Sequence, residues 1–332
     1  MLERNYQFWM GGVLATQLDE VSDDPAKVED GNFWAVLIDF EGKKRFAKFA
    51  QVQEELFPSI AWSKLTGVWK SSHSEDQYIA YVNQIRKQIA EGGVYQVNAC
   101  RELRTPHEMG DGGLRGLFSQ ILRENPAPHA SYLSIPGIEI ASASPELFLS
   151  RSGNKLLTSP IKGTLRAEGE LFGEKDKAEN LMIVDLMRND LGQIADPGSV
   201  EVSELFRDEE HPGLRHLVSD ICADVGEDIS WAEIFAATTP PGSVSGAPKS
   251  AALKVISEHE QARGPYCGAL GWIHGDRAQL SVAIRTFWSN DDGLLRFGTG
   301  AGITWGSDPI LEWQETQLKA QRLISIAGGN FS

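Results

Sequence analysis

The spacing of apolar and polar residues changes repeatedly along the chain and predicts strands and helices in separate runs. Helical spacing, with start and stop signals, predicts six helices, at residues 74–92, 114–124, 175–192, 231–237, 248–260 and from 308 onward. Short apolar or alternating runs predict strands at 33–38, 46–50, 94–98, 131–135, 138–143, 147–150, 155–158, 214–225, 266–274, 279–288 and 294–299. Grouped strands with helices between the groups indicate an α+β fold.

Two of these helices carry paired carboxylates at the same spacing. Asp176 and Glu179 lie three residues apart near the start of the helix at 175–192, so both can point to one side. Glu312 and Glu315 repeat that spacing in the last helix. Two such pairs could converge on a hard cation such as Mg²⁺, which prefers carboxylate oxygens and water. The alternative is that the two pairs lie on separate, solvated helix faces, and the spacing alone does not exclude this alternative.

Composition and charge narrow the class of protein. The 332 residues are 41% hydrophobic and 23% charged, with a net charge of −15, which argues against non-specific binding to nucleic acid or anionic membranes. The three cysteines form no CxxC motif, so neither a disulfide framework nor a cysteine-based zinc site is expected. The apolar run at 8–15 is too weak for a secretory signal, and no run approaches ~20 apolar residues. We expect one cytoplasmic domain, 1–332.

Four further features are candidates for chemistry. Gly298–Gly302 could form a backbone cradle for an anion, although glycine-rich stretches are commonly only turns. Arg285 lies inside an apolar run and needs a partner, which could be a substrate carboxylate or a structural salt bridge. Lys162 lies in a Pro/Gly turn that could fix its amine, although most lysines are simply solvated. His216 lies in a predicted strand, where a structural role is the default reading.

Taken in order, a set of short motifs resembles the chorismate-utilising enzymes, over roughly residues 95–323. The motifs are Ser144–Glu146, Pro160–Thr164, Ala178–Gly192, His216–Ser219, Gly242–Lys249, Tyr266–Gly268, Ile284–Thr286, Gly300–Gly302 and Glu312–Thr316. Within the family, Pro-Ile-Lys-Gly-Thr at 160–164 and Tyr-Gln-Val-Asn at 95–98 resemble the branch that makes 4-amino-4-deoxychorismate. The branches that add a nucleophile at C2 usually have a small residue at the position of Lys162.

The resemblance implies a layered α/β/β/α sandwich of two antiparallel sheets with helices outside and the active site between the sheets. The implied reaction is Mg²⁺-dependent amination of chorismate with ammonia, which leads to 4-aminobenzoate and folate. A glutamine amidotransferase is the implied partner. No cysteine has the setting of a glutaminase nucleophile, so free ammonium should support turnover without that partner.

The resemblance also implies roles for individual residues. Glu179 and Glu315 would bind Mg²⁺, with Asp176 and Glu312 supporting it through water. Glu146 would protonate the departing C4 hydroxyl, His216 would contact the ring nearby, and Lys162 would attack C2 covalently. The implied substrate contacts are Gly163, Thr164, Lys249, Tyr266, Arg285, Gly300, Ala301 and Gly302.

Two departures from the family pattern, and two rival functions, qualify these expectations. Residues 1–70 resemble a shortened N-terminal portion, so we expect no tight tryptophan site. The usual aromatic-Pro-Gly-Gly loop reads Thr239-Pro240-Pro241-Gly242. An anthranilate-type synthase is the rival within the family, and a non-catalytic chorismate-binding or scaffold subunit is the rival of another class.

Overall fold

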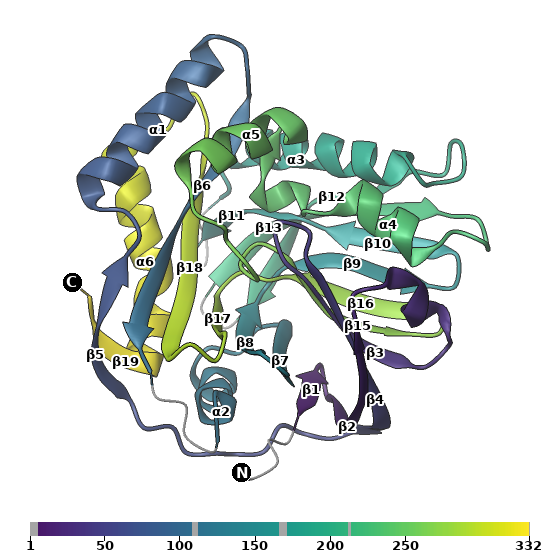
Figure 1. Cartoon of the computed structure of the whole chain (residues 1–332). Coiled ribbons are helices and arrows are strands. Elements are labelled where there is room, and N and C mark those ends of the chain that lie inside the picture. The colour runs from purple at the N-terminus through teal and green to yellow at the C-terminus, as the bar shows by residue number, and fades with distance from the viewer. Residues whose placement is uncertain (1–5, 108–111, 166–170, 212–213, 332) are drawn as a thin grey trace.

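The structure is a computed structural model that describes residues 6–107, 112–165, 171–211 and 214–331 (Figure 1). Six α-helices lie in these ranges: α1 (Glu75–Ala90), α2 (Arg115–Glu124), α3 (Glu174–Gly192), α4 (Trp231–Thr238), α5 (Lys249–His259) and α6 (Pro309–Ala327). Two short 3-10 helices, η1 (Pro25–Glu29) and η2 (Gly242–Val244), complete the helical part.

The remaining elements of the described chain are nineteen strands in one hydrogen-bonded sheet. They are β1 (Gln7–Met10), β2 (Val13–Ser22), β3 (Phe33–Ile38), β4 (Lys44–Glu54), β5 (Leu65–Ser71), β6 (Gln96–Pro106), β7 (His129–Ile135), β8 (Ile138–Ser144), β9 (Leu147–Ser152), β10 (Lys155–Ser159), β11 (Ile161–Leu165), β12 (Glu201–His211), β13 (Leu214–Asp224), β14 (Gly246–Ala247), β15 (Ala269–His274), β16 (Arg277–Val282), β17 (Thr286–Ser289), β18 (Leu294–Ile303) and β19 (Gly328–Phe331).

All six predicted helices are present, and local capping explains their starts. Ser74 and Gln77 form the predicted capping box at α1, and Ser230 and Glu233 form another at α4. At α6, the Asp308 carboxylate accepts from the backbone N–H groups of the first turn. Because such caps depend on neighbouring residues only, helix starts were accessible to sequence reasoning.

The expectation of two separate sheets is wrong, because one ladder of strands connects all of them. The ladder runs β12-β13-β10-β9-β16-β15-β3-β4-β2-β1-β7-β8-β17-β18-β6-β5-β19, while β11 pairs with β13 and β14 with β6. Among the described strands, every pairing is antiparallel except that of β19 with β5. The two halves of the ladder meet at the β1–β2 hairpin, whose turn residues Gly11 and Gly12 both have positive φ. The expected class, α+β, is confirmed.

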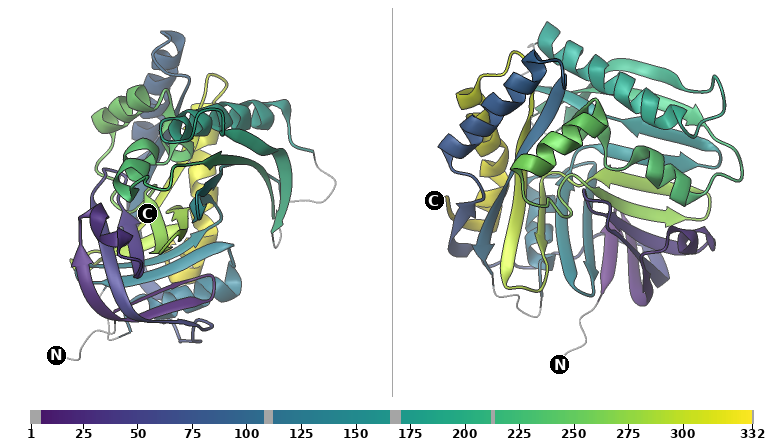
Figure 2. Two further views of the ribbon diagram at one scale, coloured as in Figure 1. Left: turned by 90° about the vertical axis from the view of Figure 1, so that its right-hand side faces the viewer. Right: turned by 45° about the horizontal axis from the view of Figure 1, so that its top comes forward.

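Helices and strands together bury two clusters of apolar side chains. The larger cluster includes Trp34 on β3, Ile183 on α3 and Leu280 on β16, and the smaller includes Phe118 on α2 and Leu323 on α6. Figures 1 and 2 place α1, α3, α4 and α5 along one side of the molecule and α2 at the opposite end. Helix α6 packs on β18 and contacts α1.

Two of the chain segments that cross between the halves of the sheet carry predicted site residues. Glu146 lies between β8 and β9, and Arg285 lies between β16 and β17. Backbone bonds join the crossings, from Val282 N to Glu146 O (3.1 Å) and from Ala143 N to Arg285 O (3.0 Å). The prediction of one unbroken strand over 279–288 is therefore wrong. Arg285 has φ 52°, a left-handed backbone that interrupts the ladder.

Other differences concern strands that were expected to be loops. The Gly298–Gly302 stretch lies inside β18, and Lys162 lies in the short strand β11 instead of a turn. Six further strands, β1, β2, β5, β12, β14 and β19, were not predicted. All three cysteines are free, as expected, and no helix in the described ranges is long and apolar enough to span a membrane.

Candidate active site

Lys162 reaches the interior from an irregular strand. The β11–β13 register shifts between Ile161 and Thr164, and Gly163 has φ +84°, a conformation that favours glycine. The half-buried Lys162 side chain donates from Nζ to the carbonyl oxygen of Ser243 (2.9 Å). Burial lowers the pKa of Lys162, while the negative charge of Glu146 opposes that shift. A lysine in this setting is closer to the neutral, nucleophilic state than one in water.

Glu146 is a deeply buried carboxyl group beside this lysine. Its residue is 4% exposed, and its backbone N–H donates to Ser144 Oγ (3.2 Å). Burial raises the pKa of Glu146, and the Ser243 hydroxyl and Lys162 act against that rise. A carboxyl group with a raised pKa is suited to donate a proton near neutral pH.

Ser243 is a site residue that sequence reasoning missed. Its carbonyl oxygen accepts from Lys162, and its hydroxyl lowers the pKa of Glu146, so one residue of η2 acts on both groups. Gly242 brings η2 close to α3, because a Cβ at Gly242 would lie 2.3 Å from Met187 Cε. A backbone carbonyl leaves no signal in a sequence, although the motif at 242–249 did mark this loop.

Arg285 completes the charged interior. The sequence suggested either a substrate carboxylate or a structural salt bridge as the partner of Arg285. Among the described residues, no carboxylate lies within salt-bridge distance of Arg285. Burial lowers the pKa of Arg285, and the charge of Glu146 opposes this shift. A guanidinium group held in this way can accept a carboxylate ligand through its paired N–H donors.

The glycines of β18 give the site room, although they do not form the loop that was expected. Gly302 lies opposite Asn98 in the ladder with β6. A Cβ at Gly302 would lie 2.4 Å from Gln96 Nε2 and 4.0 Å from Lys162 Nζ. The absence of a side chain at Gly302 therefore keeps space open beside Lys162.

Tyr266 packs directly on the same strand. Its buried ring lies over Gly298, where a Cβ would be 2.1 Å from Tyr266 Cγ. We expect Gly298→Ala to lower the free energy of unfolding by about 1–3 kcal/mol, because the ring or the strand must move. Thermal unfolding followed by circular dichroism measures this change. Gly306→Ala is the control, since a Cβ there meets no atom within 4 Å; equal stability of the two variants would contradict the prediction.

The paired carboxylates lie on α3 and α6. Burial raises the pKa of both Glu179 and Glu312. Burial also acts to raise the pKa of Glu315, but the positive charges of Lys319, Lys175 and Lys162 outweigh burial, and the net shift is downward. Lys319 is the largest of these, with its Nζ 2.6 Å from Glu315 Oε1. Glu179 and Glu315 each act to raise the pKa of Lys162, and Glu315 also acts to raise that of Glu179. The two helices therefore direct negative charge toward one region.

These residues offer the donor set that Mg²⁺ favours, although they do not form a finished metal site. In the described part of the chain, no three His, Cys, Asp or Glu side chains are grouped closely enough to bind a metal. Glu179 pairs instead with Lys175 (3.8 Å) and Glu315 with Lys319, while Asp176 Oδ2 accepts from Gly173 N (3.0 Å). The carboxylates are hard oxygen donors, partly buried, so a divalent cation fits their charge if these lysines are displaced.

Three other predicted residues have different surroundings. His216 is buried on β13, opposite Thr164 of β11, and the side chain of Thr164 lies outside what the structure describes. Lys249 Nζ pairs with Asp190 Oδ2 (2.6 Å). Asp190 is eleven residues after Glu179 on α3, about 16 Å along the axis. The structure thus gives Lys249 a structural partner away from the acidic pairs.

Lys319 is the second residue that was missed. Besides pairing with Glu315, it donates from Nζ to the carbonyl oxygen of Gly300 (3.1 Å). It therefore connects α6 to the glycine strand. The spacing of four residues from Glu315 is a helical pairing that could have identified it.

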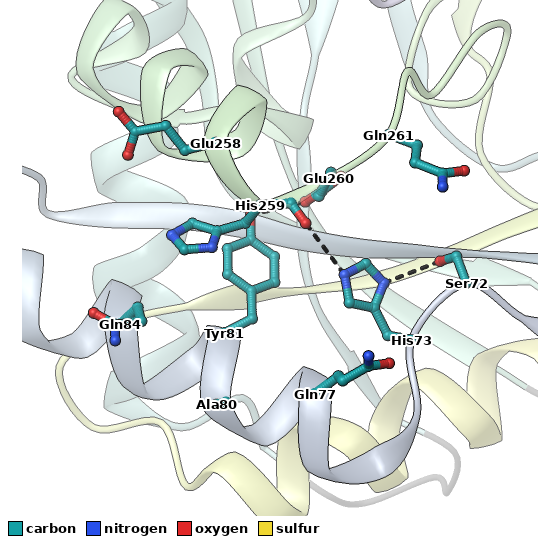
Figure 3. Close-up of a pocket in the computed structure, with 10 residues that line it drawn as sticks. All are labelled: Ser72, His73, Gln77, Ala80, Tyr81, Gln84, Glu258, His259, Glu260 and Gln261. Atoms are coloured by element: carbon teal, nitrogen blue, oxygen red, sulfur yellow. Dashed lines mark hydrogen bonds between the residues drawn. The ribbon is translucent and has the colours of Figure 1, made fainter.

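A cavity of about 500 Å³ lies elsewhere, between α1 and the end of α5 (Figure 3). None of the predicted site residues lines it. The Tyr81 ring stacks on His73 and lies tilted against His259. Polar groups of the cavity bind one another: His73 is hydrogen-bonded to Ser72 Oγ and to the His259 carbonyl. We therefore place the candidate chemistry at Lys162 and Glu146.

Comparisons with known proteins agree on the kind of enzyme. A model of the family described as chorismate binding enzyme matches residues 39–325. Aminodeoxychorismate synthase component 1 of Klebsiella aerogenes is 33% identical over 88% of this chain and 68% of its own length. Anthranilate synthase component 1 3 of Haloarcula marismortui is 37% identical over 77% of this chain, which spans about half (53%) of that protein. Anthranilate synthase component I from Streptococcus pneumoniae TIGR4 has the same fold, with a TM-score of 0.79 at 21% identity over 96% of this chain and 90% of that one.

Proposed function

Because the chain belongs to the family of chorismate binding enzymes, we propose that it aminates chorismate at C4 with ammonia, giving 4-amino-4-deoxychorismate. We treat residues 1–332 as one catalytic domain acting in the cytoplasm. The observation that carries the choice of C4 is Lys162, whose buried amine lies beside the acid Glu146 and is held by Ser243. An enzyme that only admits a nucleophile at C2 has no need of an amine there.

The proposed reaction divides one substitution into two. The neutral Lys162 amine attacks C2, the ring double bond shifts, and the C4–O bond breaks. Glu146 gives its proton to the departing hydroxyl, which leaves as water. Ammonia then attacks C4, the double bond shifts back, and the C2–N bond breaks, which releases Lys162 as an amine after proton transfer. Each step conserves atoms and charge.

The other residues bind and orient the substrate in this proposal. Arg285, Tyr266 and the backbone of Gly300–Gly302 hold carboxylate oxygens, Gly163 and Thr164 line the site, and His216 lies near the C4 hydroxyl. Glu179 and Glu315 would hold Mg²⁺, with Asp176 and Glu312 in support, and the bound ion would supply the positive charge that neutralises and orients the ring carboxylate. Lys249 is left out because of its pairing with Asp190.

The rival is an anthranilate-type enzyme, which adds nitrogen at C2. The comparisons favour it as much, since the Haloarcula relative named anthranilate synthase is 37% identical. The two functions share the acid, the carboxylates and the substrate, so only the product distinguishes them. The names of both relatives contain "component 1", which supports a second, ammonia-supplying subunit as partner.

The deciding experiment supplies purified protein with chorismate, Mg²⁺ and ammonium, and identifies the product by chromatography and fluorescence. A 4-amino product supports the proposal, and a 2-amino product supports the rival. Glutamine replaces ammonium in a parallel reaction, where we expect no product without an added amidotransferase. No turnover at all would favour a non-catalytic chorismate-binding subunit.

The pH dependence of kcat/KM should reflect Glu146 and Lys162 together. Glu146 must be protonated and Lys162 neutral, so activity should fall at both low and high pH, with limbs that belong to the coupled pair. The Ser243 hydroxyl lowers the pKa of Glu146 by bonding to its charged form. In Ser243→Ala the pKa of Glu146 should rise. One limb of the pH profile should therefore move to higher pH, and neither limb should move to lower pH. Ser257→Ala, a change at an exposed position on α5, should leave both limbs in place. A downward shift in Ser243→Ala would contradict this account.

A further inference from the structure

Arg101 is a buried cation without an acidic partner in the described part of the chain. It lies on β6, is 3% exposed, and appears in no ion pair among the described residues. Burial lowers its pKa to about 10, so it remains charged at neutral pH. Burying an unpaired charge is unfavourable, and a stable core is more easily built with an apolar residue at such a position. Its presence calls for a role beyond packing.

The contacts of Arg101 converge on one turn of α6. Its Nε donates to Thr316 Oγ1 (2.9 Å), and its guanidinium carbon lies 4.2 Å from the centre of the Trp313 ring. Its Nη1 donates to Ser71 Oγ on β5 (3.0 Å). The cation–π contact and these bonds replace a carboxylate partner.

The same turn is also tied to the glycine strand. Thr299, between Gly298 and Gly300, donates from Oγ1 to the carbonyl oxygen of Thr316 (2.8 Å). Thr316 is fully buried and directly follows Glu315. Successive residues of a helix are about 100° apart around its axis. The residue that occupies this contact therefore sets the direction in which Glu312 and Glu315 point.

We propose that Arg101 is a positioning residue, which holds α6 in the rotation that directs Glu312 and Glu315 toward Glu179. The inference rests on the proposed function, in which these carboxylates hold a divalent cation. Arg101 touches neither substrate nor metal. It acts through Thr316 and Trp313, from the face of the β6–β18 ladder against which α6 packs.

A purely structural clamp would have the same contacts, and metal affinity distinguishes the two roles. Loss of a clamp lowers stability but leaves the metal affinity of the folded protein unchanged. Loss of a positioning residue weakens metal binding in protein that is still folded. Removing supporting contacts behind metal ligands typically weakens binding by about 10–100-fold.

The test is a titration of Mn²⁺, as a spectroscopic substitute for Mg²⁺, followed by the electron paramagnetic resonance of the free ion. We expect Arg101→Gln to raise the Kd by about tenfold or more, and Arg101→Lys, which keeps the charge, to recover part of the affinity. Thr316→Val removes the hydroxyl that accepts from Arg101 and keeps a similar side-chain volume. This variant replaces Arg101→Gln in the titration if Arg101→Gln does not fold. Arg296→Gln is the control: Arg296 is on the same ladder but pairs with Glu102 and Asp292.

The outcomes separate the two proposals. A Kd within twofold of wild type in folded Arg101→Gln or Thr316→Val would overturn the positioning role and leave the proposed function intact. If the wild-type protein binds no Mn²⁺, the metal assignment of the proposed function fails, and this inference fails with it. A Kd raised equally in Arg296→Gln would also contradict a specific role for Arg101.

Discussion

Lys162→Ala should lose the 4-amino product by roughly a thousandfold or more, the range seen when a nucleophile is removed from other enzymes. The alanine leaves Glu146 and Ser243 in place but removes the only group we assign to attack at C2. With that carbon unprotected, concentrated ammonium should enter at C2 and give a 2-amino compound. Chromatography of the products measures both effects in one reaction, and circular dichroism checks that the variant is folded.

Two companion variants define what Lys162 does. Lys162→Arg keeps a positive charge but is not a nucleophile, so the covalent route predicts loss of product, and a merely electrostatic role predicts retained activity. Lys155→Ala removes an exposed lysine of the neighbouring strand β10, paired at the surface with Asp224, and should behave as wild type. Intact-mass measurement during turnover should show an adduct that is absent from Lys162→Ala. Wild-type formation of the 4-amino product by Lys162→Ala would end the covalent hypothesis.

Glu179→Gln and Glu315→Gln should each reduce turnover by about a hundredfold or more while leaving the fold intact. Each change removes one charged metal ligand at nearly constant volume. Neither residue is part of the apolar core, and their present partners, Lys175 and Lys319, are partly exposed. Turnover as a function of Mg²⁺ concentration should show a higher half-saturation in both variants.

The control for this pair is Glu174→Gln on the same helix. Glu174 is almost fully exposed and pairs with Lys177, so its change alters the charge of α3 without affecting the site. It should keep wild-type turnover and Mg²⁺ dependence. Full activity of Glu179→Gln or Glu315→Gln in the presence of EDTA would show that the carboxylates hold no catalytic metal.

Sequence reasoning found the helices and the site motifs because both depend on short stretches of chain. The capping box at Ser74 and the acidic pair of Asp176 and Glu179 can each be recognised from four consecutive residues. The break at Arg285 was not, because the apolar pattern continues through it and only its backbone angle differs. The strand predicted over 294–299 continues to Ile303, and the sequence does not show this, because glycine is disfavoured in strands unless another group approaches closely, as Tyr266 does over Gly298.

The order of the strands in the sheet could not be predicted from the sequence, for a different reason. Pairings such as Gly302 with Asn98 or Trp272 with Ala35 join residues about two hundred positions apart, and nothing local marks them. Ser243 was missed because its carbonyl has no side-chain signature, and Arg101 because its role depends on where α6 packs. Lys319 could have been found from its spacing to Glu315.

The continuous ladder has a consequence for how the protein is made. Strand β3 pairs with β15, β5 pairs with β19, and β6 pairs with β18. Each of these early strands therefore has an unpaired edge until its later partner strand has been synthesised. Contacts of such large sequence separation slow folding, because long loops must close before any pairing compensates for the lost entropy. A nascent chain on the ribosome would therefore expose strand edges to aggregation for most of its synthesis. We expect the emergence of residues 269–331, which supply these partner strands, to start productive folding, and chaperone demand to be high until then.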